Sequence, residues 1–260
     1  MQLDLPAAWL LNYGLLVARI LTLVVFAPFP GGQRTPQLSK IGLGLMLAAA
    51  LTPLAQAGPG VDIVNSPAAP WMLLKYAAAE TAFGAAIGVA FRLVIEAFGL
   101  AAQVMGFQAG FSYVNTVDPT SEVDASILNV AAVLLANLLF FAFDLHLFIV
   151  SAVARSLERW PLGSFAFRPG SEFALIELSA QTLEIAVRLA LPAMAVMLLI
   201  DLTLGLLNQA QSRLQLLQMA FPIKIVAAVA VLFFSLRHAP QLFERMAESA
   251  AEYTLSLSAF

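Results

Sequence analysis

The sequence predicts an all-α, polytopic membrane protein of about six apolar helices, some of them arranged as kinked hairpins. Of its 260 residues, 61% are hydrophobic and only 11% are charged, which is far more apolar than a soluble globular domain. The apolar residues also gather into runs near the roughly 20 residues that a helix needs to cross the hydrocarbon core of a bilayer. We therefore expect membrane lipid to surround part of the chain.

Six apolar segments follow one another along the chain. They are Ala7–Phe29, Ile41–Ala57, Trp71–Phe91, Ile127–Val153, Phe173–Leu207 and Leu214–Leu236. The first is longer than the apolar core of a signal peptide and is preceded by Asp4 rather than by basic residues, so we expect a retained helix. The second is short for a full span, and Pro53 is expected to close its helix. The fifth is long and contains Pro192, which is expected to kink or break it.

Two stretches outside the six apolar segments also have helical patterns. The third apolar pattern continues through Glu96 towards Gln103, and the residues from Pro240 to Phe260 have the spacing of a modest amphipathic helix.

Basic residues in the connections divide four against five between the two sides of the membrane, so the positive-inside rule sets no orientation. Either some segments are hairpins that do not cross fully, or assembly with partners overrides the rule.

The central stretch 103–119 combines features that are unusual beside apolar helices. It holds two glycines and a series of aromatic and polar side chains: Gly106, Phe107, Gln108, Gly110, Phe111, Ser112, Tyr113, Asn115 and Thr116. Lipid satisfies no backbone N–H or C=O group, so irregular backbone at this depth must be covered by protein or line a water-filled cavity. The stretch is interpreted as a pore-lining or gating loop, or as an ordinary polar connection between two helices.

Charged side chains lie inside the apolar segments. They are Arg19, Lys75, Glu80, Asp144, Glu184, Arg188, Asp201 and Lys224, with His146 next but one to Asp144. If each were isolated in lipid, together they would cost about 20–30 kcal/mol. The signs balance, so we expect structural charges that are paired or buried against other subunits. Glu184 and Arg188 share a helical face, and Asp201 and Lys224 are expected to pair across the last hairpin.

The residues do not indicate an enzyme. Asp144 and His146 are two apart and share no helical face, so a buried hydrogen-bonded pair is expected there and not a catalytic or metal site. No nucleophile stands at a recognisable spacing from a base, and no phosphate-binding or dinucleotide motif is present. Cysteine is absent, which excludes disulfides and thiolate metal sites. We expect no cofactor and no metal, and the small net charge of -3 gives no indication of a nucleic-acid partner.

Two non-enzymatic functions remain. One is a small-solute secondary transporter or channel that uses the buried intramembrane charges. The other is one subunit of an oligomeric channel for a large or unfolded substrate. A transporter of this length is expected to show two related halves, and no internal repeat is found. The channel subunit is favoured.

Short motifs then give the chain a family resemblance. In order they are Gly14-Leu-Leu-Val-Ala-Arg19, Pro28-Phe-Pro30, Lys40-Ile-Gly-Leu-Gly-Leu45, Glu80 with Gly84 and Gly88, Gln108-Ala-Gly-Phe-Ser112 with Val117-Asp-Pro119, Asp144-Leu-His146, Leu189-Ala-Leu-Pro192, Asp201-Leu-Thr-Leu-Gly205 and Phe221-Pro-Ile-Lys224. With these motifs, over nearly its whole length, the chain resembles the flagellar biosynthesis protein FliR family and its virulence counterparts in type III secretion.

The resemblance implies a single copy in a helical export-gate complex of the bacterial inner membrane, at the flagellar basal body. The partners would be FliP-type and FliQ-type subunits, joined by an FlhB-type subunit above an FlhA-type ring, and the cargo would be unfolded export substrates. Residues 1–122, including the pore loop 103–119, would resemble a FliP-type subunit. Residues 123–260 would form helical hairpins, the last part resembling a FliQ-type subunit.

The resemblance also assigns a role to the central loop. It would supply part of a gasket that restricts ions and small solutes while the gate rests, with Gly106 and Gly110 as hinges. The side chains that would press on the closed pore are Phe107, Phe111, Tyr113 and Val114, and Thr116 stands where the family commonly has a bulky residue.

Overall fold

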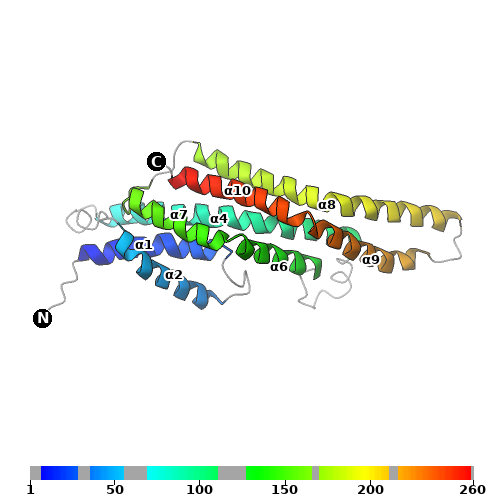
Figure 1. Cartoon of the computed structure of the whole chain (residues 1–260), viewed down its shortest axis with the longest axis horizontal. Helices are drawn as coiled ribbons and strands as arrows, with labels where there is room; N and C mark the ends of the chain where they lie inside the picture. The colour runs from blue at the N-terminus through cyan, green and yellow to red at the C-terminus, as the bar shows by residue number, and fades with distance from the viewer. Residues whose placement is uncertain are drawn as a thin grey trace. The chain divides into compact units, whose positions relative to one another are not determined.

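Every regular element in the described part of the chain is a helix (Figure 1). The computed structural model describes residues 7–28, 36–55, 69–110, 127–165, 170–210 and 216–258. The helices are α1 (Ala7–Phe26), α2 (Gln37–Leu51), the 3₁₀ helix η2 (Thr52–Leu54), α4 (Ala69–Ala109), α6 (Ile127–Ala142), α7 (Leu145–Arg159), α8 (Ser171–Ala210), α9 (Leu216–Leu236) and α10 (Ala239–Ser258). The prediction of an all-α protein is confirmed.

The described helices supply four to six candidate membrane spans. Four stretches are long and apolar enough on their own, and they lie in α1, α2 with η2, α4 and α8. Two further spans result if each of two bent pairs counts as one, namely α6 with α7, bent by 57°, and α9 with α10, bent by 60°. The expectation of about six apolar segments, some of them kinked, is therefore confirmed.

Two helices are longer than the sequence predicted. The helix α4 has 41 residues and α8 has 40, so each is about 60 Å long, roughly twice the thickness of the hydrocarbon core. The helical part of α4 includes residues 103–109, which the sequence assigned to the central loop. Pro192 lies inside α8 without ending it, because a proline removes one backbone hydrogen bond and the turns on either side keep theirs.

Other boundaries agree with the sequence. Pro53 lies in η2, directly after α2 ends at Leu51. In α10, Phe243 and Met246 are buried while Glu244 and Glu248 are exposed, so the predicted amphipathic C-terminal helix is confirmed.

The fourth apolar segment is broken where the sequence predicted continuous helix. Asp144 has a φ of 54°, a left-handed conformation that is uncommon for any residue other than glycine. A helix cannot continue through this conformation, so α6 ends at Ala142 and α7 begins at Leu145.

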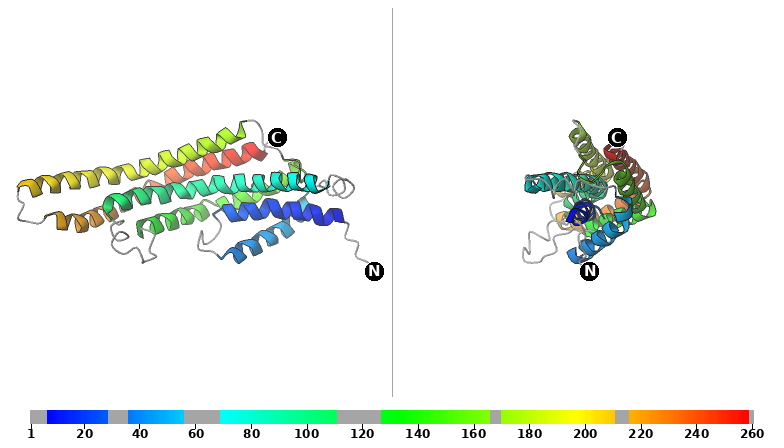
Figure 2. Two further views of the ribbon diagram at one scale, coloured as in Figure 1. Left: turned by 180° about the vertical axis from the view of Figure 1, so that it is seen from behind. Right: turned by 90° about the vertical axis from the view of Figure 1, so that its left-hand side faces the viewer.

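The chain folds into two compact units. The first takes the described residues up to Leu93, residues 140–178 and those from Ala247 onwards. Within it α1 and α2 lie side by side (Figure 2), with Gly44 and Ala48 of α2 buried. Its core includes Leu16 and Ile20 of α1 and Ile149 of α7.

The second unit takes residues 94–139 and 179–246. Phe98 of α4 and Phe243 of α10 pack with their ring centroids 5.7 Å apart, and the Asn129 side chain of α6 donates a hydrogen bond to the Gly99 carbonyl of α4 at 2.8 Å. Both units draw on segments from either side of residue 122. The likeness of residues 1–122 and 123–260 to two different subunit types stays a prediction.

Candidate functional site

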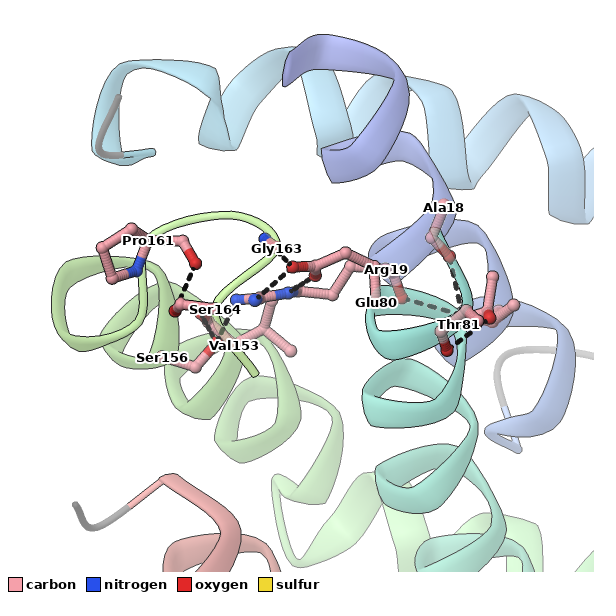
Figure 3. Close-up of polar contacts among 11 residues, drawn as sticks. Ala18, Arg19, Glu80, Thr81, Val153, Ser156, Pro161, Gly163 and Ser164 are labelled. Atoms are coloured by element: carbon pink, nitrogen blue, oxygen red, sulfur yellow. Dashed lines mark hydrogen bonds and ion pairs between the residues drawn. The ribbon is translucent and has the colours of Figure 1, made fainter. Parts of the chain in front are cut away.

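A buried ion pair joins α1 to α4 in the first unit (Figure 3). Arg19 of α1 and Glu80 of α4 are both fully buried. The Arg19 guanidinium donates from Nε to Oε2 of Glu80 and from Nη2 to Oε1, the second at 3.0 Å. Such a two-point contact between a guanidinium and a carboxylate is both directional and strong. It gives each buried charge the counter-charge that it needs.

The pair has further partners in α7 and in the residues that follow it. Nη1 of Arg19 donates to Oγ of Ser156 at 3.2 Å, and the Gly163 amide donates to Oε1 of Glu80 at 2.6 Å. The Arg19 guanidinium also lies 4.8 Å from the centroid of the Phe83 ring, a cation–π contact. One polar cluster thus ties α1, α4, α7 and the segment after α7 together.

Two glycines bring α4 unusually close to α1. A Cβ atom added at Gly84 would lie 2.1 Å from the Arg19 carbonyl oxygen and 2.4 Å from Oγ1 of Thr22. One added at Gly88 would lie 2.7 Å from Cβ of Phe26. Gly84 and Gly88 have a small-xxx-small spacing, which lets two helix backbones approach closely.

Four other intramembrane charges form two further ion pairs. Glu184 and Arg188 are 2.5 Å apart, as are Asp201 and Lys224, so both predicted ion pairs are present. Yet the Glu184 and Arg188 side chains are more than half exposed, and that of Asp201 is 44% exposed. In this chain by itself these three side chains are therefore exposed, and their burial against other subunits stays a prediction.

The sequence named Arg19 and Glu80 as structural charges but did not pair them with each other. The count of charges could have indicated the pair. Once Glu184 is paired with Arg188 and Asp201 with Lys224, two basic residues, Arg19 and Lys75, are left as partners for two acidic residues, Glu80 and Asp144. Nothing in the sequence indicated Ser156 or the Gly163 amide as partners. A backbone amide carries no residue-specific signature, and Ser156 lies 137 residues from Arg19.

The expected Asp144–His146 pair is not formed. Asp144 is exposed, and its carbonyl accepts the amides of Leu147 at 3.0 Å and Phe148 at 3.1 Å. His146 lies against the Phe141 ring, and its buried Nδ1 has no hydrogen-bond partner in the described part of the chain. The left-handed turn at Asp144 starts a new helix, in which residues two apart point in different directions. Among the described residues, no group of three His, Asp or Glu side chains is placed to hold a metal ion.

The central stretch is described only up to Gly110. Gly106 is buried inside the unbroken α4, whereas Phe107 is 61% exposed near the end of that helix. Gly110 has a φ of 85°, and its amide donates to the Phe107 carbonyl at 3.1 Å. A left-handed glycine at this position is a common way to end a helix. The other predicted pore residues lie outside the described ranges: Phe111, Tyr113, Val114 and Thr116.

Comparison with known families covers nearly the whole chain. Residues 10–250 match the family model described as bacterial export proteins, family 1. The chain belongs to this family. Family 1 membership, together with the helical spans, makes it a multi-pass inner-membrane component of the flagellar or type III export apparatus and not an enzyme.

Curated relatives of this family 1 protein carry the name flagellar biosynthetic protein FliR. The one from Escherichia coli strain K12 is 27% identical over 225 residues, which is 86% of this chain and 84% of that protein. The one from Pectobacterium carotovorum subsp. carotovorum is 27% identical over 242 residues, 92% and 89% of the two chains. The one from Bacillus subtilis strain 168 is 24% identical over 234 residues, 88% and 86% of the two chains.

Proposed function

We propose that this family 1 protein is a subunit of the flagellar export gate and forms part of the channel through which unfolded proteins cross the inner membrane. The observation that carries the proposal is the family match over residues 10–250. The names of the curated relatives from Escherichia coli, Pectobacterium carotovorum and Bacillus subtilis favour the flagellar system over an injectisome.

The surface of α8 supports assembly with other subunits. A stripe of exposed apolar side chains follows the helix with the spacing of one face: Leu183, Val187, Leu191, Leu198, Leu202 and Leu206. The exposed Glu184–Arg188 pair lies on the same stretch of helix, and hydrocarbon is a poor environment for charges. A helix of about 60 Å also exceeds one bilayer core. Protein is the better cover for this face, and the partners that we propose are FliP-type and FliQ-type subunits, with FlhB-type and FlhA-type subunits joining them.

The end of α4 supports a role for the central loop. Phe107 presents an exposed aromatic side chain in the last turn of α4, which ends at Ala109, just before the left-handed Gly110. Aromatic and apolar side chains seal a closed pore without binding a passing chain through specific hydrogen bonds. Phe111, Tyr113 and Val114 continue this apolar series into the loop, and together these residues form the proposed gasket.

The native mass of the protein in mild detergent tests its place in a complex. Expressed with its FliP-type and FliQ-type partners, the chain is expected to enter one stable large complex that holds a single copy of it. Expressed alone, it is expected to form no such species. A well-behaved monomer or small homo-oligomer that is indifferent to these partners would contradict the proposal and favour a solute transporter.

Replacing Phe111 and Tyr113 together by Ala is expected to make cells leaky to small solutes, because the closed pore loses two of its sealing rings. Leakage is measured as uptake of a small impermeant solute, and assembly as recovery of the native complex. A matched control is Phe173→Ala, which removes an exposed aromatic side chain in α8 that is not part of the proposed gasket. Unchanged permeability of cells with the assembled double variant would rule out the gasket.

A further inference from the structure

Residues 160–165, here called the strap, follow α7 without helical structure. Leu162 and Phe165 are buried in the first unit, while Ser164 is exposed. The Trp160 amide donates back to the Ser156 carbonyl of α7 at 2.8 Å, and within the strap the Ser164 amide donates to the Pro161 carbonyl at 3.0 Å. The position of the strap therefore depends largely on contacts with other elements.

Two contacts hold the strap against α4. The Gly163 amide donates to Oε1 of Glu80 at 2.6 Å, and the Phe165 ring packs edge-on against Phe83, with centroids 4.7 Å apart. Gly163 has a φ of 80°, in the left-handed region that favours glycine. The turn that brings this amide to Glu80 (Figure 3) thus favours glycine at this position.

The ion pair beneath the strap is complete without it. Nε and Nη2 of Arg19 occupy both oxygens of Glu80, and Gly84 lets the backbone of α4 approach that of α1 at Arg19 without any contribution from the strap. If the strap left, both buried charges would stay paired and the Gly163 amide would be free to bond with water. Detachment of the strap therefore leaves no uncompensated buried charge.

One atom in the strap favours its release. Nε1 of Trp160 is buried and has no hydrogen-bond partner in the described part of the chain. A buried donor without an acceptor destabilises the state that buries it. When the strap is released, water can accept a hydrogen bond from this N–H. The free energy gained in this way offsets part of what is lost with the contacts to Glu80 and Phe83.

We propose that the strap is a releasable latch, which docks on a preformed α1–α4 ion pair and opens without unfolding the helices of the first unit. When closed, it anchors residues 160–165, directly after α7, to α4. When open, it frees residues 160–165 from α4. The latch thereby controls how freely the start of α8 moves away from α1 and α4.

Single cysteines test the latch, because the natural chain contains none. Three reporter variants of the full chain are compared: Leu162→Cys in the strap, Leu157→Cys in α7 and Leu16→Cys in α1, all at buried positions. The rate of maleimide labelling in mild detergent is measured with and without Phe165→Ala. Phe165→Ala is expected to speed labelling at position 162 at least about tenfold, because it removes the buried ring that closes the strap. Rates at positions 157 and 16 are expected to stay the same.

A second substitution tests whether the strap is held in place through α7. Ser156→Ala removes the α7 acceptor of Arg19 and leaves the Gly163 and Phe165 contacts in place, so the rate at position 162 is expected to be unchanged. Faster labelling at position 162 in this variant would mean that the strap docks through α7, which overturns the proposal.

Two other results would also overturn the latch. Equal acceleration at all three reporters under Phe165→Ala would show that the strap is part of one cooperative core. No acceleration at position 162 would show that the aromatic contact does not close it. If Phe165→Ala does not accumulate, Phe165→Leu keeps an apolar side chain and removes the edge-on ring contact, and the same comparisons apply.

Discussion

Glu80→Gln is expected to lower the free energy of unfolding by about 3–5 kcal/mol, the typical cost of removing one partner from a buried ion pair. The variant keeps nearly the same volume, so the loss reports charge and not packing. Arg19 would remain fully buried on α1, facing an amide whose N–H₂ group is itself a donor. The measurement is denaturant-induced unfolding of the full chain in mild detergent.

The matched control is Glu184→Gln. Glu184 also pairs with an arginine, but both side chains of that pair are more than half exposed in this chain, and an exposed pair at this helical spacing contributes only about 0.5 kcal/mol. A loss of stability in Glu80→Gln no larger than in this control would show that water or another group compensates Arg19.

A double variant tests whether the two charges act as a unit. Combining Arg19→Leu with Glu80→Gln removes both charges, so no uncompensated ion stays buried. The double variant is expected to lose less stability than the sum of the two single variants, with a coupling energy above about 1 kcal/mol. Additive losses would contradict a direct interaction.

Gly84→Ala is expected to cost about 3 kcal/mol of stability, near the upper end for overpacking a buried site. The added Cβ would lie 2.1 Å from the Arg19 carbonyl oxygen, and backbone cannot move aside as the tip of a side chain can. The helices α1 and α4 must separate, which also lengthens the contacts between Arg19 and Glu80. The measurement is the same unfolding experiment, accompanied by the yield of folded protein.

Gly205→Ala serves as its control, because a Cβ at Gly205 in α8 meets nothing within 4 Å. Alanine favours helix over glycine by up to about 1 kcal/mol, so this variant is expected to be neutral or slightly more stable in the isolated chain. Both substitutions add one methyl group in place of a hydrogen atom, but Gly84→Ala is expected to lower the stability and Gly205→Ala to leave it unchanged or raise it. Equal effects at positions 84 and 205 would refute close α1–α4 packing as the cause.

Much of the fold follows from the sequence, because it depends on properties that are local along the chain. Apolar runs of about 20 residues require a backbone that satisfies its own hydrogen bonds, which in lipid means helix. The amphipathic face of α10 and the Glu184–Arg188 pair follow from the repeat of a single helix. Pro53, next to the end of a short apolar run, correctly indicated where α2 stops.

Other features depend on which segments meet in space, and there the sequence was silent or misleading. It did not predict the break at Asp144, since the apolar pattern runs through it, nor the continuation of α4 to Ala109 and of α8 past Pro192. Propensity rules give the local cost of glycine or proline, but packing decides whether a helix continues through it.

By itself the sequence determined that this protein is a helical membrane protein with balanced intramembrane charges. Only the tertiary structure decided that Arg19 pairs with Glu80, 61 residues away, and that the Gly163 amide shares the same carboxylate. The physical reason is that apolar periodicity is a local property of one helix, whereas the partner of a buried charge depends on which other helix packs against it.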